Sequence, residues 1–163
     1  MIIETFLDGK LQTRNMNYYY YKNVSLPKVI STTFTNDSDT ISFDLTSVYP
    51  VPSLLSLIRT NVYQRKSANQ SVTIQDYVKF SSLTSFSFGI PSRNGVWTTI
   101  SASNNTLVGK FTVSSNTVNV RINTSNPFTY KVVTKTRNSV TFTRLGIYMT
   151  SPILKDTIKV TYC

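Results

Sequence analysis

The chain has 163 residues, of which 40% are hydrophobic and 12% aromatic, and its 17 Lys and Arg against 7 Asp and Glu give a formal net charge of +10. This length predicts a single domain over residues 1–163 whose core needs no disulfide or metal, and the hydrophobic content excludes a disordered chain. No apolar run approaches the roughly 18 residues that a membrane-spanning helix needs, so no membrane partner is expected.

The absence of histidine restricts the chemistry that the chain can perform. The sequence contains no His and one Cys, Cys163, and Glu4 is its only glutamate. Without His, the Ser–His–Asp and Cys–His arrangements and the His-containing zinc sites are excluded. Catalysis by a pair of carboxylates is not favoured either, because the chain has only 7 Asp and Glu. The sequence therefore predicts that the protein is not an enzyme, and it predicts no catalytic residue, no cofactor and no metal site.

The first half of the chain alternates β-prone segments with polar turns. Residues 36–39 (Asn-Asp-Ser-Asp) and 93–95 (Arg-Asn-Gly) predict turns, and Asn-Gly is the strongest short hairpin signal. Residues 53–63 fit either an amphipathic helix or a buried strand. The segments expected as strands, rich in β-branched and aromatic residues, are 2–7, 18–24, 28–35, 40–45, 71–74, 84–90 and 96–101.

The second half shows a clearer alternation of apolar and polar residues. Residues 118–123 (Val-Asn-Val-Arg-Ile-Asn) have a period of two, which is typical of a strand with one buried and one wet face. Segments 128–132, 140–143 and 157–162 repeat this pattern. Gly146 indicates a bulge or a close backbone approach. Short strands at steady spacing predict an all-β fold, an antiparallel two-sheet β-sandwich of jelly-roll type with at most one short helix.

Three groups of residues are candidates for an interface or a ligand site. One is a run of four tyrosines: Tyr18, Tyr19, Tyr20 and Tyr21. As a strand, this run has rings on both faces, so one face is either covered internally or exposed as an interface or sugar-stacking surface. Trp97, the single tryptophan, is expected in the core or at a lectin-like sugar contact. Arg65 and Lys66 are adjacent cations that suit an acidic partner.

The positive charge has two interpretations, contact with a polyanion or acidic surface, or solubility alone. Most Lys and Arg residues are spread singly along the chain, and the closest groupings are Arg65-Lys66 and Lys131, Lys135 and Arg137. Without a basic arm or a dense patch, direct nucleic-acid binding is not expected. A nucleic-acid-binding β-protein stays the last alternative, and its affinity would fall steeply with salt. The first residues lack the features of a secretory signal, and one Cys cannot form an internal disulfide. Both features predict synthesis in a reducing cytoplasm.

Segments such as 94–99 (Asn-Gly-Val-Trp-Thr-Thr) and 118–122 (Val-Asn-Val-Arg-Ile) resemble small jelly-roll or sandwich proteins in the virions of tailed bacteriophages. This resemblance is one of general character and assigns no role to a single residue. It implies a capsid-associated virion protein, either a head auxiliary (decoration) or a head-fibre subunit. Such a protein is made in the host cytoplasm and acts by assembly with itself and with other virion proteins.

Two other functions fit the same sequence features. A small jelly-roll coat protein or a head–tail connector subunit stays within the virion class. A carbohydrate-binding β-sandwich module belongs to another class, with a glycan stacked on the four tyrosines or on Trp97. The chain has one tryptophan and few acidic residues, so it offers few of the side chains with which such a module stacks and hydrogen-bonds a sugar.

Overall fold

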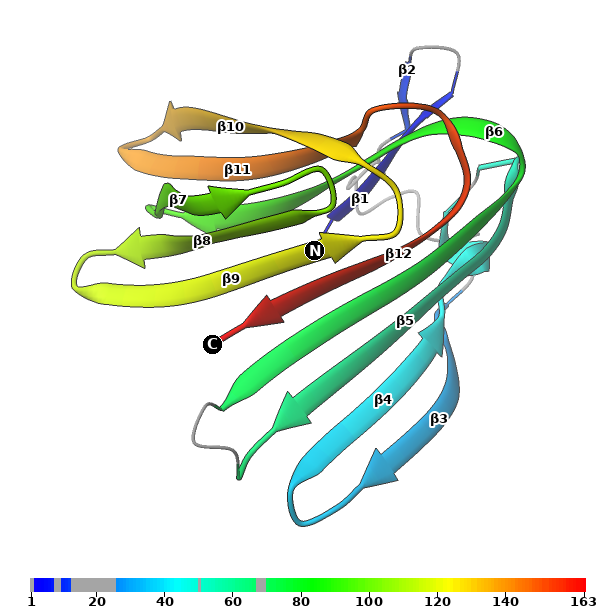
Figure 1. The fold of residues 1–163 in the computed structure, drawn as a ribbon, viewed down its shortest axis with the longest axis horizontal. Coiled ribbons are helices and arrows are strands. Elements are labelled where there is room, and N and C mark those ends of the chain that lie inside the picture. Colours follow the sequence, from blue (N-terminus) through cyan, green and yellow to red (C-terminus); the bar gives the residue numbers. More distant parts are fainter. Residues whose placement is uncertain (1, 8–9, 13–25, 50, 67–69) are drawn as a thin grey trace.

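Antiparallel β-strands make up almost the whole fold (Figure 1). The structure, a computed structural model, describes residues 2–7, 10–12, 26–49, 51–66 and 70–163. In this described part the only helical segment is a 3-10 turn, η2 (Thr46–Val48). The strands are β1 (Ile2–Leu7), β2 (Lys10–Gln12), β3 (Lys28–Phe34), β4 (Ser38–Asp44), β5 (Leu54–Gln64), β6 (Ser71–Arg93), β7 (Val96–Ala102), β8 (Thr106–Val113), β9 (Asn116–Thr124), β10 (Phe128–Arg137), β11 (Val140–Met149) and β12 (Ile153–Tyr162).

One long strand, β6, belongs to two sheets. Residues 71–80 of β6 pair with β5 and β12, whereas residues 85–93 pair with β1 and β11. Between these parts the strand bends, and residues 81–83 are exposed (Figure 1). The larger sheet has the order β3-β4-β5-β6-β12-β9-β8-β7, and the smaller sheet has the order β2-β1-β6-β11-β10.

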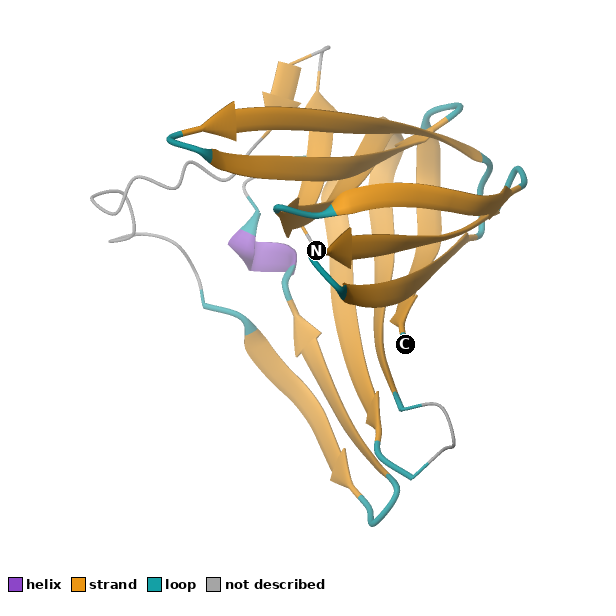
Figure 2. Ribbon diagram, turned by 90° about the vertical axis from the view of Figure 1, so that its left-hand side faces the viewer, coloured by secondary structure: helices purple, strands orange, loops and turns teal. Residues whose placement is uncertain are grey.

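The two sheets enclose a single hydrophobic core. The smaller sheet contributes Phe88 and Ile147, the larger sheet contributes Leu107, Ile122 and Val160, and these side chains are all completely buried. In Figures 1 and 2 the hairpin β10–β11 lies across from β7, β8 and β9, with the core between them. In β8, in β12 and in the first part of β6 buried residues alternate with more exposed ones, as expected for strands with one face on the core, whereas β3, β4 and β7 contain no fully buried residue. The predicted all-β, antiparallel sandwich is confirmed.

The structure also resolves the ambiguous segments of the sequence. Residues 54–64 form β5, so a strand rather than a helix is the correct interpretation of segment 53–63, although within β5 only Leu57 is fully buried. The two strands expected at 71–74 and 84–90 are parts of the continuous strand β6. The turn at residues 93–95 is present, and Asn94 adopts a φ of 56° there. Asn tolerates this left-handed conformation better than most residues.

Gly146 stands directly opposite Gly89 on the neighbouring strand, and both leave space for one arginine. A Cβ on Gly146 would lie 2.8 Å from Nη1 of Arg144, and a Cβ on Gly89 would lie 2.7 Å from Nε of Arg144. Arg144 Nη1 donates a hydrogen bond of 3.1 Å to the Tyr148 hydroxyl. The register is regular at this point. The sequence signal at Gly146 therefore reflects close approach and not a bulge.

A buried ion pair joins β5 to β6. Arg59 and Asp76 are cross-strand partners, and Arg59 donates through Nε at 2.7 Å and through Nη2 at 2.8 Å to the two oxygens of Asp76. The Asp76 side chain is fully buried, and that of Arg59 is 17% exposed. Burial disfavours the guanidinium charge, but the Asp76 carboxylate outweighs it and raises the pKa of Arg59 above its ordinary value.

Replacing Asp76 with Ala should lower the free energy of unfolding by about 3 kcal/mol or more, because Arg59 is left as a desolvated charge without its partner. The double replacement Arg59→Met with Asp76→Leu should recover most of this loss, since it removes both charges. Urea unfolding at pH 7 measures the difference. A double variant as unstable as Asp76→Ala would contradict this explanation.

Candidate functional site

The two faces of the larger sheet differ in chemistry. Cross-strand partners share a face, so the register assigns each residue to the inner face, which includes the core, or to the outer face, which points away from it. The inner face contains the buried residues Val78, Ile158 and Ile122. Their chain neighbours are on the outer face, where Ser, Thr, Asn and Lys predominate.

Five cations form a diagonal line on the outer face, across β6, β12, β9 and β8. We call them the basic stripe: Lys79, Lys155, Lys159, Arg121 and Lys110. Lys155 stands directly opposite Lys79, and Arg121 stands opposite Thr161. All but the half-buried Lys110 are exposed. Among the described residues, no carboxylate lies within ion-pairing distance of the stripe.

Neutral hydrogen-bonding side chains surround the basic stripe. The hydroxyls of Thr73 and Thr161 lie 3.1 Å apart, on the strands β6 and β12 that carry three of the cations. Beside Lys155 the surface is hollowed into an open pocket of about 360 Å³, whose wall includes Tyr77, Asn126 and Thr157. The outer face therefore combines positive charge with many groups that can donate hydrogen bonds.

Asp156 is a buried carboxylate next to this pocket. Its side chain points to the inner side of β12, and the residue is 2% exposed. The backbone N–H of Ser125 donates to Oδ1 at 2.7 Å, whereas Oδ2 has no hydrogen-bond partner among the described residues. Burial raises the pKa of Asp156 above its ordinary value, because desolvation of the charged form outweighs its hydrogen bonds.

The inner face of the larger sheet is only partly covered. One row of register partners crosses five strands and defines what we call the open inner face: Phe34, Asp39, Tyr63, Val72 and Tyr162. Phe34 is 66% exposed, Tyr63 is 41% exposed and Val72 is 39% exposed. Figures 1 and 2 show β3, β4 and the adjoining ends of β5 and β6 extending beyond the part that β10 and β11 cover.

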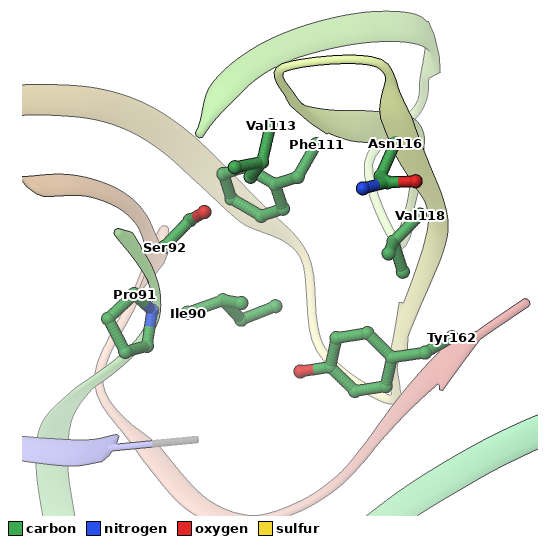
Figure 3. A pocket seen from close by; sticks show the side chains of 8 residues that line it. All are labelled: Ile90, Pro91, Ser92, Phe111, Val113, Asn116, Val118 and Tyr162. Carbon is green, nitrogen blue, oxygen red and sulfur yellow. The ribbon is translucent and has the colours of Figure 1, made fainter. Parts of the chain in front are cut away.

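A pocket of about 400 Å³ lies where the open inner face meets the sandwich (Figure 3). Its wall is mainly apolar and includes Ile90, Phe111 and Val118. The hydroxyl of Tyr162 points into the pocket, and the Asn116 side chain lies on the same side (Figure 3). Burial raises the pKa of the Tyr162 phenol, and the nearby Arg59 charge opposes part of that rise. The pocket suits an apolar side chain or ligand with one polar group.

The candidate residues from the sequence lie in separate places. The run Tyr18 to Tyr21 lies outside the described residues. Trp97 packs edge-on against Phe111, with ring centroids 4.9 Å apart, and donates from Nε1 to the Thr99 hydroxyl at 2.8 Å. It is half-buried and lines a third pocket, of about 320 Å³, between β7 and the hairpin β10–β11.

Arg65 and Lys66 contact the turn between β3 and β4. Arg65 forms an ion pair with Asp39 and donates to the backbone carbonyl of Thr35. Lys66 Nζ lies 2.9 Å from Oδ1 of Asp37. Both cations therefore have acidic partners within their own chain, and the Lys66 pair is exposed enough to contribute little stability.

Sequence reasoning missed both the basic stripe and the open inner face. The members of each group come from different strands, so they are far apart along the chain. The alternation in residues 118–123 and 157–162 does place Arg121 and Lys159 on wet faces. Only the register of the strands shows that these residues are neighbours.

Replacing Asp156 with Asn should stabilise the protein at pH 7 and lose this advantage at about pH 4. The native carboxyl has a raised pKa, so its stabilising contribution is present while it is protonated and is lost as the pH rises through that pKa. Urea unfolding of both proteins at the two pH values tests this. A pH-independent difference between them would contradict it.

Within the described part of the chain, no helix is long and apolar enough to span a membrane, and no three His, Cys, Asp or Glu residues gather in a group that could hold a metal ion. No model of a known protein family matches the chain. No curated protein matches it significantly either. The surfaces described above are therefore what a functional proposal can use.

Proposed function

We propose that this protein is a structural subunit that acts by protein–protein assembly, as a capsid-associated component of a bacteriophage particle. A head auxiliary (decoration) or head-fibre role fits best. The observation that carries the assembly part is the open inner face, and the resemblance of the sequence to phage virion proteins supports the setting. The partners are copies of this chain and other virion proteins.

The open inner face lacks the second layer that a β-sheet normally requires. A sheet buries its apolar face against another element, and here the half of the sheet formed by β3, β4 and β5 exposes part of its apolar face. Tyr63 and Val72 are neighbouring exposed apolar side chains, and Phe34 lies in the same row on the other side of Asp39. Contiguous apolar surface of this kind typically marks a contact site.

The edge strand β3 favours contact through the face over pairing along the edge. All seven residues of β3 are exposed. The register of β3 against β4 shifts between Val29 and Ser31, which leaves Ile30 as an extra residue, and Lys28 stands at the start of the strand. A bulge and a lysine both oppose the continuous addition of strands to a sheet edge. This geometry supports a closed assembly.

Charge is also compatible with contact between two copies. The chain carries +10, but Asp39, the charged residue of the open inner face, is already paired with Arg65. Two such faces can approach each other without unpaired like charges. The twofold arrangement that results is the most common symmetry of homo-oligomers.

The double replacement Phe34→Ser and Tyr63→Ser should convert the wild-type multimer to a monomer of 18.4 kDa. The replacements remove apolar area from the contact and leave the core intact. Size exclusion with light scattering over a range of concentrations measures the mass. Leu83→Ser, at a 68% exposed residue on the bend of β6, is the matched control and should assemble as the wild type does. A wild-type protein that stays monomeric throughout would contradict self-assembly through this face.

A carbohydrate-binding role is the second candidate, because the pocket at Trp97 combines an aromatic ring with polar groups. Its wall includes Asn94, Thr134, Thr141 and Thr143. Sugars bind where a flat ring lies beside hydroxyl and amide partners. Trp97 Nε1 already donates its hydrogen bond to the Thr99 hydroxyl, so it is not available to a sugar. This makes the carbohydrate role weaker than the assembly role.

Titration with a panel of neutral oligosaccharides should leave the fluorescence of Trp97 unchanged if assembly is the function. Trp97 is the only tryptophan, so the signal reports on this pocket alone. Thr134→Val with Thr141→Val is the control for any response. A saturable change that these replacements abolish would favour the carbohydrate role.

A further inference from the structure

We propose that the basic stripe on the outer face binds the phosphate backbone of double-stranded nucleic acid without sequence preference. The stripe consists of Lys79, Lys155, Lys159, Arg121 and Lys110, as defined above. It lies on the face opposite to the open inner face, so this proposal does not depend on the assembly function.

The arrangement of the stripe is difficult to explain by stability. Lys155 and Lys79 are directly opposite each other on neighbouring strands, and like charges in such a pair destabilise a sheet. Elsewhere on the larger sheet the chain compensates charge, as in the pairs Arg59–Asp76 and Arg65–Asp39. Five cations without a described acidic partner therefore indicate that the compensating charge comes from another molecule.

The dimensions of the stripe suit a linear polyanion. From Lys155 to Lys110 the stripe advances along the strands by eight residues in register and crosses two strands. At about 3.4 Å per residue and about 4.8 Å between strands, it is roughly 30 Å long. Duplex DNA rises about 3.4 Å per base pair, so the stripe can follow about nine base pairs of backbone.

The neutral groups beside the stripe are also those that contact phosphates. Hydroxyl and amide side chains supply many of the backbone contacts in protein–DNA complexes. Thr161 lies two residues from Lys159 on β12 and opposite Arg121 on β9, and its hydroxyl is 3.1 Å from that of Thr73. Asn126 and Thr157 line the pocket at Lys155. These groups read no base sequence, so the proposed binding is independent of sequence.

The outer face favours a duplex over a single strand. Proteins that hold single strands usually stack successive bases on a series of aromatic rings. Among the described, paired residues of this face, Tyr77 is the one aromatic residue. The cations remain as the main source of affinity, and such binding weakens steeply as salt rises.

Fluorescence anisotropy with a labelled duplex of random sequence tests the proposal. Wild-type protein should bind at low salt, with a slope of log K against log salt of up to about −4.5, about 0.9 for each of the stripe's cations. The replacements Lys155→Gln and Lys159→Gln should lower the affinity about tenfold and make the slope less steep by about 1.8. Circular dichroism and thermal melting confirm that each variant is folded.

The matched control removes the same charge from another surface. Lys131 and Lys135 are exposed cations on β10, in the smaller sheet, so Lys131→Gln with Lys135→Gln should change the affinity less than twofold. An equal loss in the control would show an effect of net charge alone and overturn the proposal. Absence of binding at low salt would overturn it too. Tighter binding to polyglutamate than to DNA would assign the stripe to an acidic protein partner instead.

The two proposals can fail separately. Phe34→Ser with Tyr63→Ser changes the open inner face, and its affinity for the duplex per subunit should equal that of the wild type. If that variant is monomeric and still binds, both proposals hold. If the stripe variant still assembles but no longer binds the duplex, the two functions belong to different faces.

Discussion

The rest of the structure depends on one constraint, which is that a single strand serves two sheets. Because β6 pairs with β5 and β12 in its first part and with β1 and β11 in its second part, it joins the two sheets through one continuous backbone. Phe80, Phe86 and Phe88 lie along this strand and are buried. Their rings are in mutual contact, with centroids 5.9 and 6.5 Å apart. The continuous core follows from this shared strand.

The shared strand also explains why the protein has two surfaces of opposite chemistry. The larger sheet is wider than the smaller sheet, so the smaller one covers only part of its inner face. The uncovered part continues the core and carries exposed apolar residues, and its acidic residue Asp39 is paired with Arg65. The uncompensated lysines are on the other side of the same strands.

Much of the fold could be predicted from the sequence, because side-chain alternation and turn chemistry are local. The alternation in residues 118–123 predicts the buried Val120 and Ile122 of β9, although Val118 in the same pattern is 44% exposed, and Asn94-Gly95 marks the turn between β6 and β7. Local signals failed at β6, where Ser81, Ser82 and Leu83 are exposed and interrupt the alternation although the backbone continues as a strand.

The candidate sites could not be predicted, because they depend on which strands become neighbours. Nothing near Lys79 in the sequence indicates that Lys155 will stand opposite it. The same holds for Tyr63 and Val72, and for Trp97, whose partner Phe111 is on another strand. From the sequence, Arg65 and Lys66 were candidates for binding a partner. They are neighbours of Asp39 and Asp37 only because β4 pairs with β5, and this pairing cannot be predicted from the local sequence.

The position of β12 has a consequence for how the chain reaches its native state. β12 follows all other described strands in the sequence, yet it lies in the middle of the larger sheet, between β6 and β9. Until it inserts, the facing edges of β6 and β9 are open. Pairings between residues so distant in the chain, such as Thr73 with Thr161, form slowly because a large loop must close first. During synthesis, open edges of neighbouring chains can meet before β12 arrives. A slow insertion of β12 therefore lengthens the time during which the edges of β6 and β9 can pair with another chain.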